Sequence, residues 1–385
     1  MLITNGKLML EQDFNYRDLL VKDGRIVEIL PHHSGYQDED VYDAHGSVVT
    51  PGFIDLEVHG AMGYDMSDAV DEAYDTVSRE LLKHGVTSYI GAVDSFDEDI
   101  LEEAYTAAGE WISGSHAGAR MLGLQMRGPF LNPEMAGPQN RRFLRSPDVA
   151  LYKKLQAASG GNILFVNVSP ELEGAFPFIR EVSKTAKVML SNSTAGFDTA
   201  RMGYAWSAYG CSDLFRNMNY GSAFDPGLPG ATMDIARAVT MRYDNDSVVH
   251  PSLLRMTFNE FYDRLCLVSG CTAFSGLPAG SYEIEDHTVH ISRAKALFED
   301  GSDAGSIMYL DACVQNVMGM GALPLPIAVF AVTEIPARVL GIFDEVGSIT
   351  VGKRADLTVL DLHSHEVQSV FQNGILTYDE RKNYD

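Results

Sequence analysis

Residues 51–60, with the sequence PGFIDLEVHG, decide the fold of this chain. Apolar, aromatic and β-branched side chains bounded by proline and glycine are typical of a short buried strand. Near its end stand Glu57 and His59, two residues apart, so their side chains project to the same side of the strand. The segment therefore predicts a core strand that ends in a pair of polar side chains.

Further β-rich runs follow along the chain, at residues 87–92, 120–126, 162–168, 187–193, 211–215, 247–250 and 264–270. Helix-compatible stretches such as 71–84 and 148–158 separate most of them, and the last helix must fit within about residues 252–263. Eight alternating strand and helix units close naturally into a (β/α)8 barrel of the TIM type. The sequence thus predicts an α/β protein.

Both ends of the chain differ from the middle. Residues 1–50 and 346–378 hold short strands separated by turn signals such as Asn-Gly and Asp-Gly. We expect the two termini to form one small β-sandwich domain, made of residues 1–50 and 346–385, beside a barrel of residues 51–345.

Composition excludes several classes of partner. The chain has 385 residues, with 53 acidic against 29 basic side chains and a formal net charge of −24. Such a charge disfavours nucleic acid and anionic membranes. The four cysteines form no C-x-x-C pair, and neither a leader peptide nor a long apolar span is visible. We expect a cytoplasmic protein with a small-molecule ligand.

Four motifs carry a resemblance to a known family. They are GLQMRGPFLNP (123–133), FDPGLPGA (224–231), RLCLVSGCTAFSGLPAG (264–280) and DAGSIMYLDACVQNVM (303–318), in this order. Together with both termini they resemble the N-acetylglucosamine-6-phosphate deacetylases of the amidohydrolase superfamily. The resemblance implies a hydrolase of carbohydrate metabolism that removes the N-acetyl group of an amino-sugar phosphate, and a homodimer paired through the FDPG loop.

The family's chemistry implies a divalent metal at the mouth of the barrel, where the ion lowers the pKa of bound water and polarises the amide. Its ligands are a glutamate after the third strand and histidines after the fifth and sixth, and an aspartate after the eighth is the general base. This chain has Arg127, Asn192, Asp213 and Gly270 at those positions. Gly270 stands in place of the catalytic aspartate, so we expect no catalytic residue of the standard mechanism. The resemblance then implies a pseudoenzyme.

Arg127 has two readings. The guanidinium either pairs with Glu57 or Asp213 as a structural cation, or it binds an anionic ligand. In the first case it neutralises the carboxylates in place of a metal, so no cofactor is expected. A divalent zinc, iron or manganese ion fits only a rearranged site, whose residual candidates are Glu57, His59 and Asp213.

The candidate substrate-binding residues are His59, Arg127, Arg216 and His250. Arg216 stands at the family's asparagine, and His250 matches a substrate-contacting histidine. Each of the two histidines could instead have a purely structural role, as a hydrogen-bonded polar residue at a strand end. Phe224 replaces the arginine that reaches the partner subunit's substrate phosphate, which weakens the case for a shared active site.

Three functions stay open at this level. The chain is a deacetylase with a rearranged metal site, a non-catalytic relative that binds a sugar phosphate or a protein partner, or a metal-free enzyme of another reaction type. Chemistry resides in the site and not in the barrel, so the resemblance alone does not decide between them.

Overall fold

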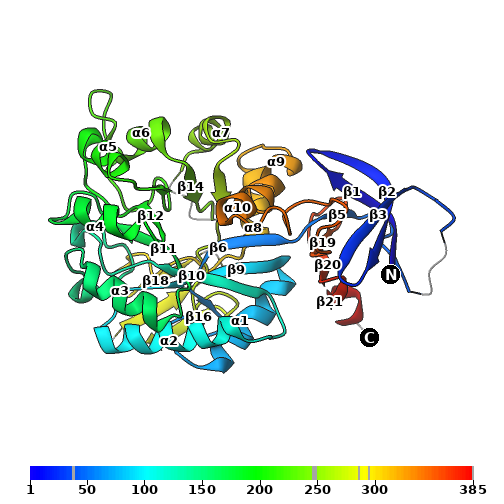
Figure 1. The fold of residues 1–385 in the computed structure, drawn as a ribbon, viewed down its shortest axis with the longest axis horizontal. Helices are drawn as coiled ribbons and strands as arrows, with labels where there is room; N and C mark the ends of the chain where they lie inside the picture. Colours follow the sequence, from blue (N-terminus) through cyan, green and yellow to red (C-terminus); the bar gives the residue numbers. More distant parts are fainter. Residues whose placement is uncertain (37–39, 245–248, 285–286, 294, 384–385) are drawn as a thin grey trace.

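A computed structural model describes residues 1–36, 40–244, 249–284, 287–293 and 295–383. A large barrel domain of alternating strands and helices occupies one side of the molecule, and a smaller domain of strands that contains both termini occupies the other (Figure 1). Among the described residues no helix is long and apolar enough to cross a membrane.

Eight parallel strands form the barrel, in the order in which they follow one another along the chain. They are β6 (Phe53–Val58), β9 (Val86–Val93), β10 (Arg120–Met126), β11 (Ile163–Val168), β12 (Lys187–Leu190), β13 (Gly210–Cys211), β14 (Ala238–Met241) and β15 (Leu265–Leu267). Every residue of β6, β9, β14 and β15 is buried, as expected of strands covered on both faces.

Segment 269–271 bridges the gap between the first and last strands, β6 and β15. The Gly270 amide donates to the carbonyl of Glu57 (3.0 Å) and the His59 amide to the carbonyl of Cys271 (2.8 Å). These bonds nearly close the barrel, and they place position 270 beside the end of the first strand. The predicted (β/α)8 barrel is confirmed.

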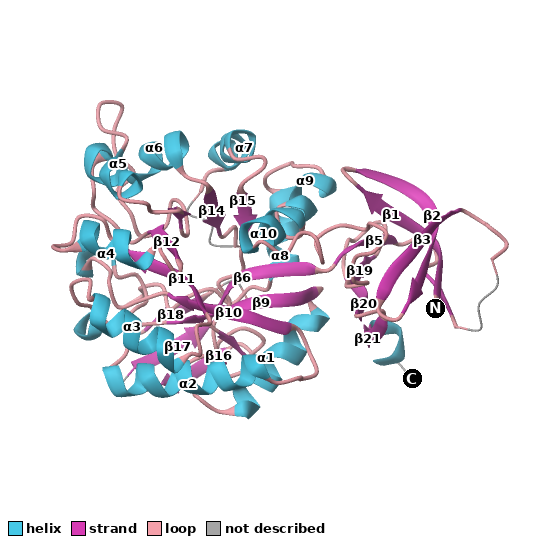
Figure 2. Cartoon of the chain, viewed as in Figure 1, coloured by secondary structure: helices cyan, strands magenta, loops and turns pink. Residues whose placement is uncertain are grey.

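Helices surround the strands (Figure 2). They are α1 (Asp71–Lys83), α2 (Glu98–Ser113), α3 (Val149–Ala158), α4 (Ala175–Val182), α5 (Phe197–Ala205), α6 (Gly227–Ile235), α7 (Pro251–Glu260), α8 (Leu310–Gly319), α9 (Leu325–Phe330) and α10 (Glu334–Leu340). Short 3₁₀ turns add Pro133–Met135, Arg141–Phe143 and Glu380–Asn383.

Local sequence explains where individual helices begin. The Asp148 carboxylate accepts hydrogen bonds from the amides of Ala150 and Leu151, so it caps α3. In α7, the ring of His250 accepts from the amide of Ser252 (3.2 Å), and Pro251 takes the first helical position, where its missing N–H costs nothing.

Two of the predicted barrel strands were wrong. The seventh was expected at 247–250, but the seventh strand is β14 at Ala238–Met241. Residues 247 and 248 lie outside the described residues, and His250 caps helix α7, which begins at Pro251. The sixth was expected to run to Phe215, but β13 ends at Cys211, because Asp213 and Phe215 have positive φ values of 56° and 68° that no strand allows.

The terminal domain contains one sheet built from both ends of the chain. Its strand order is β21-β20-β19-β5-β1-β2-β3, and β4 also pairs with β1. The strands are β1 (Leu2–Leu10), β2 (Asp13–Lys22), β3 (Arg25–Pro31), β4 (Val41–Asp43), β5 (Val48–Pro51), β19 (Leu357–Leu360), β20 (Val367–Gln372) and β21 (Ile375–Asp379). Its own apolar core includes Ile3, Val49, Leu357 and Phe371. The predicted sandwich domain at the termini is confirmed.

A third sheet was not anticipated from the sequence. Strands β16 (Gly280–Ile284), β17 (His287–Ile291) and β18 (Ala296–Phe298) form an antiparallel sheet between β15 and α8, with a small core that includes Phe274 and Val289. A two-stranded ribbon, β7 (Gly60–Ala61) and β8 (Tyr64–Asp65), follows the first barrel strand.

Candidate functional site

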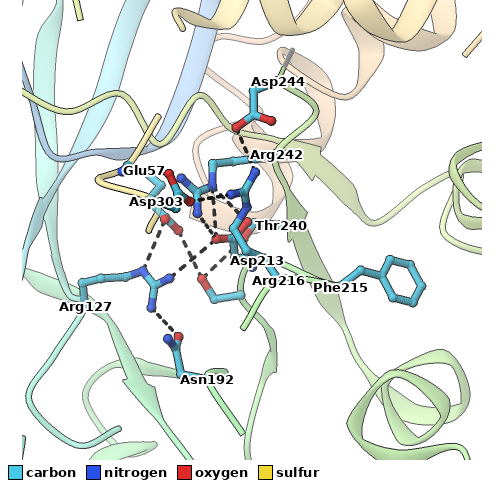
Figure 3. A network of polar contacts seen from close by, with 12 residues as sticks. Glu57, Arg127, Asn192, Asp213, Phe215, Arg216, Thr240, Arg242, Asp244 and Asp303 are labelled. Atoms are coloured by element: carbon cyan, nitrogen blue, oxygen red, sulfur yellow. Dashed lines mark hydrogen bonds and ion pairs between the residues drawn. The ribbon is translucent and has the colours of Figure 1, made fainter. Parts of the chain in front are cut away.

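The carboxyl ends of neighbouring barrel strands bring the site residues together. Arg127 follows β10, Asn192 and Asp213 lie two residues beyond β12 and β13, and Arg242 follows β14. Figure 3 shows Arg127 between Asn192, Asp213 and Glu57, which stands near the end of β6, and Arg242 beside Asp213. Because parallel strands all end at the same rim of the barrel, residues far apart in sequence meet at its mouth.

Arg127 lies between two carboxylates and an amide. Its Nε donates to Oε1 of Glu57 (3.3 Å), its Nη1 donates to Oδ1 of Asn192 (2.8 Å), and its Nη2 lies 3.6 Å from Oδ2 of Asp213. The expected pairing of Arg127 with Glu57 or Asp213 is thus found with both. Its guanidinium is engaged by protein groups on three sides (Figure 3).

Asp213 is held by a second arginine that sequence reasoning missed. Nε of Arg242 donates to both carboxylate oxygens of Asp213 at 3.1 Å, and Nη2 donates to Oδ2 at 2.5 Å. Burial alone would lower the pKa of Arg242, but Asp213, Glu57 and Asp244 outweigh it and raise that pKa. Arg242 is therefore a permanent cation in this cluster.

His59 joins the cluster from the other side. Its Nδ1 lies 3.1 Å from Oδ2 of Asp94, which follows β9, and its Nε2 lies 3.4 Å from Oε1 of Glu57. Burial by itself opposes protonation, but the two carboxylates prevail and raise the pKa of His59 to about 10. Burial likewise opposes ionisation of Glu57, whose pKa is nevertheless lowered by Arg127, His59 and Arg242. The histidine is an imidazolium at neutral pH and accepts no proton.

Gly270, at the position where the resemblance implies the family's aspartate, lies against the side chain of Arg242. The glycine has φ +56°, and a Cβ built on it would lie 2.4 Å from Cδ of Arg242. Real Cβ atoms do not approach other atoms so closely. Arg242 thus fills the space in which a side chain at position 270 would lie.

The cluster is buried in this structure. The exposed fractions are 1% for Glu57, 2% for Asp213, 5% for Arg127, 6% for Arg242 and 8% for His59. The loop after β10 covers it: Asn192 Nδ2 donates to the carbonyl of Met135 (2.7 Å), and Gln139 Nε2 donates to that of Arg127 (3.4 Å). These charges are matched to one another rather than open to a ligand.

The other predicted substrate residues lie apart from the central cluster or have other partners. Arg216 donates to Asp244 (2.8 Å) and Asp303 (3.0 Å), in a second salt-bridge group shown in Figure 3. His250 is exposed and caps α7 through the hydrogen bond described above. Phe224 is 100% exposed. The structure therefore brings together Glu57, His59, Arg127, Asn192 and Asp213, and places His250 elsewhere.

The residues at the mouth do not fit a divalent metal. Asn192 and Gly270 offer at most one neutral oxygen donor, and Arg127 is a cation that repels an ion. The carboxylates of Glu57 and Asp213 already accept from Arg127 and Arg242. Among the described residues, no three His, Cys, Asp or Glu side chains are grouped so that they could hold a metal ion.

Two members of the cluster, Arg242 and Asp94, were not predicted from the sequence, although the sequence contains a pattern that indicates each of them. Arg242 directly follows the apolar run AVTM (238–241), as Arg127 follows QM, but the run was not identified as a strand. Asp94 follows the end of β9 in the same way. A polar residue directly after a buried parallel strand points to the barrel mouth whatever its type.

Solved structures define the class of this fold. N-acetylglucosamine-6-phosphate deacetylase from Pasteurella multocida superposes with a TM-score of 0.90 at 24% identity, covering 97% of this chain and 98% of the other. A variant of the Mycobacterium smegmatis enzyme in complex with N-acetyl-D-glucosamine-6-phosphate gives a TM-score of 0.89 at 23% identity, covering 98% and 99%. The Amidohydrolase family matches residues 284–383. The chain therefore has the amidohydrolase barrel.

Sequence relatives define the family within that class. The N-acetylglucosamine-6-phosphate deacetylase of Bacillus subtilis (strain 168) is 30% identical over 336 residues, 86% of this chain and 84% of the relative. The enzyme of the same name from Lysinibacillus sphaericus is 27% identical over 349 residues, 90% of this chain and 89% of the relative. The chain belongs to the N-acetylglucosamine-6-phosphate deacetylase family.

Proposed function

We propose that this protein is a member of the deacetylase family that does not hydrolyse N-acetylated sugar phosphates by the metal-dependent route. One observation carries the proposal: Arg127, at the position where the resemblance implies a ligand glutamate, forms ion pairs with Glu57 and Asp213. A guanidinium cannot be deprotonated in proteins, so it neither ligates an ion nor generates a hydroxide.

The remaining groups supply no substitute for the general base. Position 270 has no side chain, and the nearest histidine, His59, already carries its proton between Asp94 and Glu57. Asp213 accepts hydrogen bonds from Arg242, forms an ion pair with Arg127 and is only 2% exposed, so it is not free to take a proton from water. Loss of both metal activation and the base removes the two largest contributions to this type of amide hydrolysis.

The test combines metal analysis with a hydrolysis assay. We expect purified protein to contain a transition metal at far below one ion per chain, and to release no acetate from N-acetylglucosamine 6-phosphate or N-acetylgalactosamine 6-phosphate. The Bacillus subtilis relative, prepared in parallel, controls for metal loss during purification. One zinc, iron or manganese ion per chain, with turnover that a chelator abolishes, would overturn the proposal and support the rearranged-site alternative.

We further propose a cytoplasmic homodimer whose domains divide at residues 50 and 346, with an amino-sugar phosphate as the candidate ligand. The resemblance to the family's sugar-phosphate enzymes supports the ligand class, and it also supports pairing through the FDPG loop, on which Phe224 is fully exposed. Light scattering during size-exclusion chromatography of wild type and Phe224→Ser tests the dimer. Thermal stabilisation by glucosamine 6-phosphate tests the ligand.

A further inference from the structure

We propose that Arg127 and Arg242 together replace the charge of a divalent ion, and that Gly270 is part of the same replacement. This inference rests on the proposed function, because it explains how a barrel of this family remains folded without a metal. It adds a consequence that the proposed function does not contain: removal of both arginines leaves two buried carboxylates, Glu57 and Asp213, whose charge a divalent cation can then compensate.

The charges of the central cluster balance. Its buried anions are Glu57 and Asp213, which are 1% and 2% exposed, and its guanidinium cations are Arg127 and Arg242. Two buried carboxylates would be very costly without a matched positive charge. Since His59 pairs mainly with Asp94, the two arginines carry the compensation for Glu57 and Asp213.

The two arginines act on one pair of carboxylates. Arg127 contacts Glu57 through Nε and Asp213 through Nη2, so one guanidinium spans the two acids. Arg242 engages both oxygens of Asp213 from the opposite side. Ser212 Oγ donates to the second oxygen of Glu57 (3.2 Å), which fixes the orientation of that carboxylate. Glu57 and Asp213 are therefore joined by one guanidinium.

Gly270 belongs to the replacement because Arg242 requires it. The side chain of Arg242 passes where Cβ of residue 270 would be, at 2.4 Å from its Cδ. A side chain at 270 therefore requires Arg242 to leave the rotamer in which it holds Asp213. Restoring Glu at 127, His at 192 and 213, and Asp at 270 would leave Arg242 in collision with the new aspartate, so a reversal has to include residue 242.

The experiment compares single, double and neutralised variants in full-length protein. Arg127→Met/Arg242→Met removes both cations and keeps side chains of similar length. We expect Mn²⁺ and Zn²⁺ to raise its Tm and to bind with one ion per chain in calorimetry. Wild type and each single variant should show no metal-dependent shift, because at least one guanidinium still repels the ion. The triple variant that adds Asp213→Asn should lose the effect.

A second variant keeps the proposal testable if the double variant does not fold without metal. In Arg127→Met/Arg242→Met/Glu57→Gln/Asp213→Asn, no charge remains to be compensated on these four residues, and we expect folded protein that ignores the metal. If the double variant recovers its fold only when refolded with Mn²⁺ or Zn²⁺, the proposal holds. It is overturned if the neutralised variant is equally unfolded, or if the double variant is folded and indifferent to metal.

The outcomes separate this inference from the proposed function. Metal and turnover in the wild-type protein would overturn the proposed function. A metal-free, inactive wild type whose double variant still binds no ion would overturn only the replacement of the ion by two arginines.

Discussion

The side chain of Arg242 occupies the space that any side chain at position 270 would need, since a Cβ on Gly270 would lie 2.4 Å from Cδ of Arg242. This contact joins two positions that look independent in the sequence. Position 270, where the resemblance implies a catalytic aspartate, has no side chain, and Arg242 after the seventh strand holds Asp213. The two positions therefore act as one unit within the network of salt bridges at the barrel mouth.

The first prediction concerns Gly270→Ala. The methyl group meets Arg242, and the φ of +56° adds the cost of a left-handed conformation, about 1–2 kcal/mol. We expect a loss in the free energy of unfolding that exceeds that conformational cost, measured by urea denaturation. Gly341→Ala is the matched control, because Gly341 has φ +78° and nothing within 4 Å of the added Cβ.

The difference between these two glycine variants isolates the collision. Adding Arg242→Ala to Gly270→Ala should then restore part of the loss, through a coupling between neighbouring residues. Equal losses of unfolding free energy for Gly270→Ala and Gly341→Ala would show that Arg242 moves aside at no cost. That result would contradict the proposed dependence of Arg242 on a glycine at position 270.

The second prediction concerns Arg242→Met. The change removes the strongest partner of a buried carboxylate, and breaking a buried pair from one side costs about 3–5 kcal/mol. Adding Asp213→Asn removes the stranded charge, so we expect the double variant to regain much of that loss. Arg79→Ala breaks an exposed ion pair with Asp75 and should cost less than about 1 kcal/mol.

Chemical denaturation measures all four proteins of this series. A loss for Arg242→Met no larger than that for Arg79→Ala would mean that water reaches Asp213, contrary to its burial.

The sequence predicted the barrel because its strands are largely buried runs rich in apolar residues, and each such run can be recognised on its own. The error at the seventh strand has a physical cause: β14 has four residues, and AVTM was too short to stand out from its surroundings. With that strand misplaced, Arg242 had no expected position at the mouth. One missing strand thus concealed the second cation of the site.

The pairing of Arg127 was predictable for a different reason. A buried guanidinium needs a carboxylate, and Glu57 and Asp213 were the two acids expected at the same rim. The contact between Arg242 and Gly270 was not predictable, since it depends on a rotamer and on a positive φ that no residue pattern encodes. The contact between Nδ1 of His59 and the carboxylate of Asp94 was not predictable from the sequence either, because the two residues follow different strands.

The third prediction is a pH dependence from His59. Its pKa is raised to about 10 against an ordinary value near 6.5, so the folded protein holds a proton that the unfolded chain releases. The stabilisation by His59 is complete below pH 6.5 and declines as the pH rises toward 10, by at most about 1.4 kcal/mol per pH unit. We expect the difference in unfolding free energy between wild type and His59→Gln to shrink over that window.

Asp94→Asn provides the control for the histidine. It removes the nearest carboxylate from Nδ1, so the decline should become shallower in this background. A difference between wild type and His59→Gln that stays constant from pH 6.5 to 9.5 would show that the ring is neutral in the folded protein.

The last prediction concerns Asp55, a buried carboxyl of β6. Burial raises its pKa to about 7, although its Oδ1 accepts from the amides of Glu57 (3.2 Å) and Ser269 (3.3 Å) and Oδ2 has no hydrogen-bond partner. The folded protein keeps this proton between about pH 4 and 7, where the unfolded chain has lost it, so wild-type stability falls as the pH rises through that window. Asp55→Asn cannot ionise, and its stability relative to wild type should therefore increase from pH 4 to 7.

Asp361→Asn is a control of opposite sign. Hydrogen bonds from the amides of Ser364 and His363 lower the pKa of Asp361. The stabilisation by Asp361 is therefore lost only as the pH falls below about 4. Parallel stability curves for wild type and Asp55→Asn across pH 4–7 would mean that Asp55 is ionised in the barrel, and the excess negative charge would then have to be balanced by the arginines at the mouth.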